Sequence, residues 1–160
     1  MDKKKYYLEL SDNFSALIAG EYDVIATLAN TSALLYERLV GVNWVGFYLS
    51  NGQELVLGPF QGKVACVRIP FGKGVCGTAF SHNQVQCVED VHAFPGHIAC
   101  DAASNSEIVF PLVVNKQIIG VLDIDSPNIS QFDQEDEKWL QHLVNQLCQH
   151  LAMCSMPKYY

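Results

Sequence analysis

Hydrophobic residues in the N-terminal part of the chain recur at helical spacing. The stripe in the segment 21–40 consists of Val24, Ile25, Leu28, Thr31, Leu35 and Leu39. Steps of three and four residues are typical of a helix with one buried face. Ser11 is a candidate N-cap for a short helix before this segment. We therefore expect two N-terminal helices that end near Val40.

The middle of the chain changes to short apolar runs separated by turn residues, which is typical of strands. The runs are WVGFYL (44–49), ELVLGPF (54–60), KVACVRIPF (63–71), QVQCVED (84–90), EIVFPLVV (107–114) and QIIGVLDID (117–125). Asn51–Gly52 is the strongest short hairpin signal between two such runs. Asn115–Lys116 marks a second tight turn. These features predict a mostly antiparallel sheet.

Helical periodicity returns at two places after the first hairpin. FGKGVCGTAFSH (71–82) has three glycines that lead into a short helix, and an amphipathic helix begins near Asp133. The apolar stripe of the last helix consists of Leu140, Leu143, Val144, Leu147, Leu151 and Cys154. The order predicts a single α+β domain over residues 1–160. Its central sheet of about six strands should carry the N- and C-terminal helices on one face.

Composition narrows the class of protein and of partner. The chain has 160 residues, 49% hydrophobic and 17% charged, which suits one globular domain. Its net charge of −7 repels phosphate backbones, so nucleic acid is not an expected partner. The start MDKKKYYLEL is no signal peptide, and no apolar run approaches the roughly 18 residues that span a bilayer. We expect a cytoplasmic protein with no membrane partner.

Six cysteines must be interpreted one by one, because a chain of this length does not need disulfide staples. Cys100 lies in a polar loop with His97 and Asp101, where it is either a reactive thiol or a buried space filler. Cys76 begins a glycine-rich helix whose dipole would favour a thiolate. Cys66 is placed in a strand, and the spacing excludes a CxxC pair. Each of these two is also compatible with a structural role.

The remaining cysteines are less promising, and a zinc site competes for one of them. Cys87 shares a strand face with Val85, so it is expected in the core. Cys148 and Cys154 belong to the last helix as packing or surface residues. Zinc could be bound by Cys87, His92, His97 and Cys100, but their spacing matches no common zinc motif. No nucleotide-binding or zinc-protease motif is present, so we expect neither a metal nor a cofactor.

The sequence DID at 123–125 is unusual for a strand that begins as apolar. Alternation predicts one shared face, formed by Ile119, Val121, Asp123 and Asp125. Two carboxylates on that face either mark where the strand leaves the core or form a pocket floor. Such a floor could bind an ammonium group or share a proton.

Two residues on neighbouring strands could complete that pocket. Glu107 begins the strand next to DID and could add a third carboxyl group. Trp44 begins the first strand, and its indole could pack against a small cation or an S-methyl group. A tryptophan at this position is also a common core residue.

Four segments together resemble the free methionine-(R)-sulfoxide reductases, which are small proteins with the GAF fold. The segments are WVGFYL, GKGVCGTA, VEDVHAFPGHIACDAASNSEIVFP and GVLDIDSP. The resemblance implies that Cys100 is the nucleophile, Cys66 its resolving thiol and Cys76 an additional or alternative partner. It also implies that Glu107, Asp123 and Asp125 form the acidic part of the substrate site. Trp44 would pack near the methyl sulfoxide.

The resemblance implies an activity that the residues can support chemically. The expected reaction is reduction of free methionine-(R)-sulfoxide through a thiolate, a sulfenic acid and an intramolecular disulfide. Glu107 or one of the two aspartates would supply a proton, and thioredoxin or a similar dithiol would reduce the disulfide. A homodimer is left open. The alternatives are a GAF-type module that binds a small molecule or senses redox state without catalysis, and a chain whose cysteines are all structural.

Overall fold

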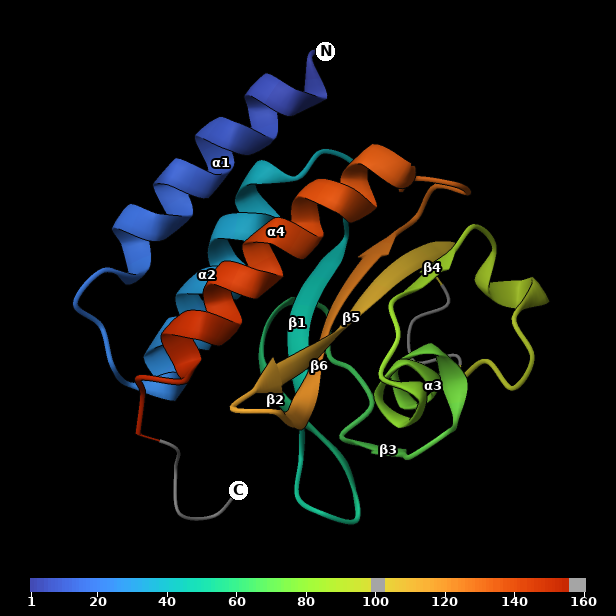
Figure 1. Cartoon of the computed structure of the whole chain (residues 1–160). Helices are drawn as coiled ribbons and strands as arrows, with labels where there is room; N and C mark the ends of the chain where they lie inside the picture. Colours follow the sequence, from blue (N-terminus) through green and yellow to red (C-terminus); the bar gives the residue numbers. More distant parts are fainter. Residues whose placement is uncertain (99–102, 156–160) are drawn as a thin grey trace.

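We analysed a computed structural model of the chain, which describes residues 1–98 and 103–155. Three helices, α1 (Lys3–Ile18), α2 (Val24–Arg38) and α4 (Gln134–Leu151), lie together on one side of the molecule (Figure 1). Side chains of Asp2, Asp23 and Asp133 cap their N-termini. At α4, Asp133 and Asp136 form a reciprocal capping box. The N-terminal pair and the last helix were therefore predicted correctly.

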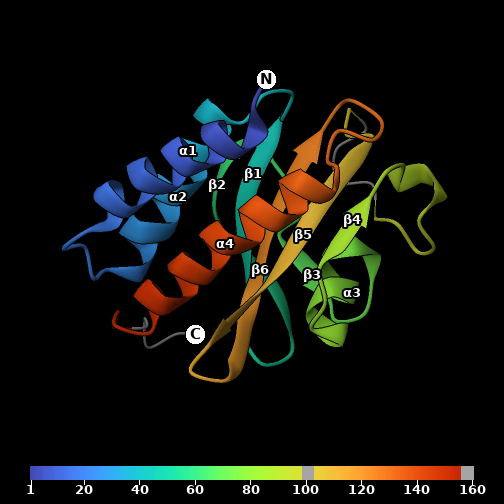
Figure 2. The same ribbon diagram turned by 45° about the horizontal axis from the view of Figure 1, so that its top comes forward.

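A six-stranded antiparallel sheet forms the centre of the fold, as the sequence predicted. The strands are β1 (Trp44–Ser50), β2 (Glu54–Gly62), β3 (Arg68–Pro70), β4 (Gln86–Val88), β5 (Ser106–Val114) and β6 (Gln117–Ser126). Their spatial order is β3-β2-β1-β6-β5-β4. Helix α3 (Gly74–His82) lies beside the short strands β3 and β4, away from the other helices (Figure 2). A 3-10 helix, Val91–Ala93, follows β4.

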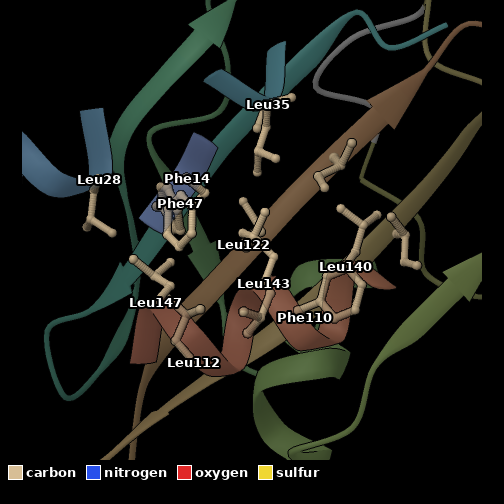
Figure 3. Packing of buried hydrophobic residues seen from close by; sticks show 14 of the residues in the cluster. Phe14, Leu28, Leu35, Phe47, Phe110, Leu112, Leu122, Leu140, Leu143 and Leu147 are labelled. Atoms are coloured by element: carbon tan, nitrogen blue, oxygen red, sulfur yellow. The ribbon is translucent and has the colours of Figure 1, made fainter. Parts of the chain in front are cut away.

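The two faces of this sheet carry two separate buried clusters. The first joins the strands to α1, α2 and α4, and its central side chains include Phe14, Phe47, Phe110, Leu122 and Leu143 (Figure 3). The second joins the other sheet face to α3 and includes Trp44, Tyr48, Val109, Val121 and Cys76. Alternate residues of the same strands thus supply both clusters, because strand side chains alternate between faces.

The turns explain how the long strands pair. Asn115 and Lys116 both have positive φ, 51° and 65°, which suits the tight turn between β5 and β6. Gly52 has φ 91° in the loop between β1 and β2, where Asn51 Oδ1 accepts from the backbone N–H of Gln53 and Glu54. Both predicted hairpins are confirmed.

Several local predictions were wrong. Ser11 lies within α1, which begins eight residues earlier at Lys3, and its hydroxyl donates to Gln146. Cys66 precedes β3 and lies in a connecting segment rather than a strand. Cys87 is exposed because β4 is an edge strand, so it is not a core residue. Ile119 packs against the first cluster, because a β-bulge between Leu112 and Val113 breaks the alternation of β6 at this point.

Among the described residues, no helix combines the length and the apolar character needed to cross a bilayer. The N- and C-terminal helices cover one face of the central sheet, as predicted. Among the described residues, α3 and connecting segments pack on the other face, beside which a pocket lies.

Candidate active site

Residues from three neighbouring strands face one another near one end of the sheet. Trp44 in β1 pairs with Asp125 in β6, and Asp125 pairs with Glu107 in β5. Directly opposed residues of antiparallel strands project from the same face, so these three side chains form a row. Asp123, two residues before Asp125, projects from the same face and lies opposite Gly46. The sequence prediction that these three acids gather is therefore supported by the register.

This row forms part of a pocket between the sheet and the start of α3. The walls come from β1, β5 and β6, from the first turn of α3, and from the segments around residues 64 and 98. Its polar or aromatic lining includes Trp44, Tyr48, Lys73, Cys76, His97, Ser104, Glu107, Asp123 and Asp125. Every acidic residue that the sequence nominated thus lies in one pocket.

Burial dominates the acid–base properties of the three carboxyl groups. Glu107, Asp123 and Asp125 are only 8%, 6% and 8% exposed. Burial, and then the charge of Asp123, raises the pKa of Glu107 to about 8. Burial raises the pKa of Asp123 to about 6, although hydrogen bonds with Asp125 and Cys76 oppose the shift. Asp123 is consequently easier to ionise than Glu107.

Asp125 behaves as the proton-sharing member of the group. Burial and the neighbouring charges of Asp123 and Glu107 raise its pKa well above the usual range. Its side chain hydrogen-bonds with both of those carboxyl groups. Among the described residues, the buried atoms Asp123 Oδ1 and Asp125 Oδ1 accept no hydrogen bond from an N–H or O–H group. A proton kept by one carboxyl group could form a hydrogen bond to a neighbouring carboxyl oxygen. The site therefore holds both an ionisable carboxylate and a carboxylic acid.

The apolar side of the pocket is built from stacked aromatic rings. The Trp44 ring lies 5.9 Å from that of Tyr48 and 5.3 Å from that of Phe60, both stacked. Trp44 Nε1 donates to the carbonyl of Lys63 at 3.0 Å, which fixes the plane of the indole. A Cβ on Gly46 would lie 2.6 Å from the Trp44 ring, so the glycine makes room for it. An S-methyl group would find a rigid apolar surface here.

The three nominated redox cysteines have different positions. Cys76 lies in the first turn of α3, is free, and is 6% exposed. Cys66 is partly buried at the edge of the second cluster and is disulfide-bonded. Tyr48 Oη donates to the Cys66 carbonyl at 3.0 Å, which ties this segment to the pocket. Cys100 lies outside the described residues.

Comparisons with known proteins decide the family. The chain matches the GAF domain family over residues 23–151. It is 63% identical to free methionine-R-sulfoxide reductase of Escherichia coli, and the match covers 100% of this chain and 97% of that protein. The chain belongs to the GAF-domain family of free methionine-R-sulfoxide reductases.

Two further free methionine-R-sulfoxide reductases agree with this assignment. The one from Saccharomyces cerevisiae is 43% identical, over 92% of this chain and 88% of its own length. The structure of the Neisseria meningitidis protein, solved in complex with its substrate, has a TM-score of 0.91 and 46% identity. That match covers 96% of this chain and 92% of the other. The family resemblance that the motifs indicated is confirmed.

The pocket of this free methionine-R-sulfoxide reductase family member contains residues that the sequence reasoning missed. Tyr48 lies two positions after Gly46 and four after Trp44, so strand alternation could have placed it on the same face. Lys73, the N-cap residue of α3, and Ser104 also line the pocket. No periodic signal marks these two, because each lies in an irregular segment.

Three side chains of the pocket could together bind a metal ion. Cys76, Glu107 and Asp123 offer three ligand atoms within 4.8 Å of one another, a set that could hold a metal ion. The zinc set considered from the sequence included Cys87, which lies on the edge strand and hydrogen-bonds toward Phe132 in the first cluster's region. Its members Cys87, His92 and His97 form no candidate metal group among the described residues, and Cys100 lies outside them.

Proposed function

We propose that the chain, acting as a single catalytic domain, reduces free L-methionine-(R)-sulfoxide to L-methionine. The observation that carries this proposal is the buried group of Glu107, Asp123 and Asp125 in one pocket with the Trp44 indole. The relatives named as free methionine-R-sulfoxide reductases, 63% and 43% identical, support the same conclusion.

Substrate binding follows from the contrast between the acidic and the aromatic side of the pocket. Asp123, the more easily ionised of Asp123 and Glu107, binds the α-ammonium group through charge-assisted hydrogen bonds. Trp44 and Tyr48 pack against the S-methyl end. A methionine sulfoxide within a polypeptide lacks the free ammonium group, so this site selects the free amino acid.

The first chemical step transfers the sulfoxide oxygen to a thiol. The thiolate of Cys100 attacks the substrate sulfur while a protonated carboxyl group, assigned to Glu107, donates a proton to the sulfoxide oxygen. In the resulting adduct the protonated oxygen passes from the substrate sulfur to the cysteine sulfur, while the sulfur–oxygen bond of the substrate and the new sulfur–sulfur bond both break. Methionine leaves with its sulfur reduced, and the cysteine becomes a sulfenic acid. A pKa of about 8 keeps Glu107 largely protonated at neutral pH, which supports this role. Asp125, whose pKa is also raised, is the alternative donor.

The second step regenerates the enzyme. Cys66 attacks the sulfenic sulfur of Cys100, and water leaves as the disulfide forms. Thioredoxin or a similar dithiol then reduces the disulfide by thiol–disulfide exchange. The dithiol becomes a disulfide itself, and both cysteines of the protein return to thiols. The disulfide-bonded state of Cys66 supports its participation. This cycle requires a reducing compartment, so we place it in the cytoplasm.

Turnover by the reduced protein tests the proposal. With free methionine-(R)-sulfoxide and a dithiol, the wild type should form methionine. Cys100→Ser should lose roughly a thousandfold or more of that rate. Cys87→Ser, which alters an exposed thiol on β4, is the matched control and should retain activity. A wild type without turnover would refute the proposed function, and an active Cys100→Ser protein would refute the nucleophile.

The same assay separates the supporting roles. Glu107→Gln keeps the shape of the side chain but cannot donate an acidic proton, so kcat should fall about 10²–10⁴-fold. An unchanged kcat would assign the proton to the aspartate pair. Peptide mapping after one turnover without reductant should give a Cys66–Cys100 disulfide, and a Cys76–Cys100 disulfide would reassign the resolving thiol.

A further inference from the structure

Cys76 lies at the start of α3, where the helix packs closely on the preceding backbone. It is the third residue of α3, directly before Gly77. A Cβ on Gly77 would lie 2.5 Å from the carbonyl oxygen of Pro70, so the helix start packs directly on backbone. The Gly72 N–H also donates to the Gly77 carbonyl at 2.9 Å. The position of the Cys76 thiol is therefore fixed by backbone contacts rather than by side-chain packing alone.

The fixed thiol faces the carboxyl groups of the sheet. The ligand atoms of Cys76, Glu107 and Asp123 lie within 4.8 Å of one another. Cys76 hydrogen-bonds with Asp123, and because an ionised carboxylate can only accept, the S–H is the donor whenever Asp123 is ionised. Burial and the nearby carboxylates raise the pKa of the Cys76 thiol well above its usual range. The expectation that the dipole of α3 makes it a thiolate is contradicted, because burial outweighs the helix terminus.

Two independent observations argue against Cys76 as a redox partner. Cys76 is free while Cys66 is disulfide-bonded in the same structure. Its side chain is 6% exposed, so a dithiol protein has almost no access to the sulfur. A thiol that retains its proton is also a poor nucleophile. The hydrogen bond between Cys76 and Asp123 therefore accounts better for a cysteine at this position than a redox role does.

We propose that Cys76 is a positioning residue whose S–H donates to Asp123 and keeps that carboxylate ionised and oriented toward the substrate ammonium group. The effect on substrate binding rests on the proposed function, whereas the hydrogen bond between Cys76 and Asp123 does not. The hydrogen bond opposes the effect of burial on the pKa of Asp123, so its loss should make Asp123 harder to ionise. Weaker binding of the ammonium group at neutral pH should follow.

The pH dependence of Asp123 reflects every ionisable group that surrounds it. The groups that face it or line the same pocket are Asp125 from β6, Glu107 from β5, Tyr48 from β1, Cys76 and Lys73 from the start of α3, and His97. Cys76 is the group whose donor can be removed or replaced without changing any of the carboxyl groups. A serine at this position keeps a donor, whereas an alanine removes it.

Steady-state kinetics of Cys76→Ala and Cys76→Ser test the proposal, with Cys87→Ala as the control for loss of a thiol elsewhere. In Cys76→Ala, KM for free methionine-(R)-sulfoxide should rise about tenfold or more with kcat changed less than about threefold, as expected for a lost hydrogen bond to a charged group. The low-pH limb of kcat/KM should move to higher pH. In Cys76→Ser both parameters should stay within about threefold of wild type.

The outcomes separate the possible roles of Cys76. Equal kcat losses in the serine and alanine variants, with no disulfide after one turnover, would overturn the proposal in favour of a redox role. Wild-type KM and pH profile in Cys76→Ala would also overturn it. Carboxyl-carbon NMR of reduced, substrate-free protein tests the contact without turnover: the pKa of Asp123 should rise in the alanine variant only. An inactive wild type would refute the proposed function and leave this NMR result to decide the inference.

Discussion

Both faces of the central sheet carry buried side chains, but the chemistry of these side chains differs. On the face toward α1, α2 and α4, Phe47, Phe110 and Leu122 are completely buried and apolar. On the face toward α3, the neighbouring positions of β5 and β6 carry three acids and pack near a buried thiol. Burial alone therefore does not distinguish core from active site. The difference is that the buried carboxyl groups need hydrogen-bond and charge partners, which a substrate could supply, whereas buried apolar groups need none.

The comparison assigns stability to one face and chemistry to the other. Apolar burial against three helices contributes favourable free energy throughout the first cluster. Burial of Glu107, Asp123 and Asp125 opposes ionisation and thereby lowers stability where they must be charged. Because the same strands carry both sets of side chains, the apolar burial on the helix-covered face offsets the unfavourable free energy of burying the carboxyl groups.

The largest expected effect concerns the helix-covered face. Phe110→Ala removes a completely buried ring between the sheet and α4 (Figure 3), so the free energy of unfolding should fall by about 3–5 kcal/mol. Urea denaturation of the reduced protein measures this loss. Glu107→Gln, three residues earlier in β5 but on the pocket face, is the matched control and should not destabilise the protein at alkaline pH. A loss below about 1 kcal/mol for Phe110→Ala would contradict the division between the faces.

A second effect should appear in the pH dependence of stability. The pKa of Glu107 is about 8 in the folded protein against a usual value of 4.5, so folding takes up a proton between these two pH values. Stability from this group is complete at acidic pH and is lost as pH rises toward about 8.

Glutamine cannot ionise, and it should remove this dependence. Between about pH 5 and pH 9, Glu107→Gln should gain on the order of 4 kcal/mol relative to wild type. Thermal or urea denaturation across this range measures the difference between the two proteins. Parallel stability curves for wild type and variant would show that Glu107 titrates normally and would remove the main contrast between the faces.

The sequence predicted the parts of the fold that depend on local periodicity. The last helix was identified by the helical spacing of its apolar stripe, and β5 and β6 were identified as apolar runs on either side of the turn at Asn115–Lys116. The row of Asp125 and Glu107 followed from the same alternation. Strong local patterns therefore predicted both long elements and the acidic part of the site.

The predictions failed where long-range packing overrides the local pattern. Cys87 alternates correctly but lies in the short edge strand β4, so it is exposed. The placement of Ile119 failed because a bulge shifts the register. The expected thiolate character of Cys76 failed because α3 packs its first turn against the acids of the distant strands β5 and β6. The sequence order alone contains no signal for that packing.

The carboxyl groups of the pocket face are proposed to recognise a free amino acid. The most direct test compares kcat/KM for free methionine-(R)-sulfoxide with that for its N-acetyl derivative, which lacks the ammonium group, by quantifying the reduced products. This recognition predicts that kcat/KM falls at least about a hundredfold for the N-acetyl derivative, because that derivative leaves the buried carboxylate of Asp123 unpaired. Values of kcat/KM within about threefold of each other would contradict it.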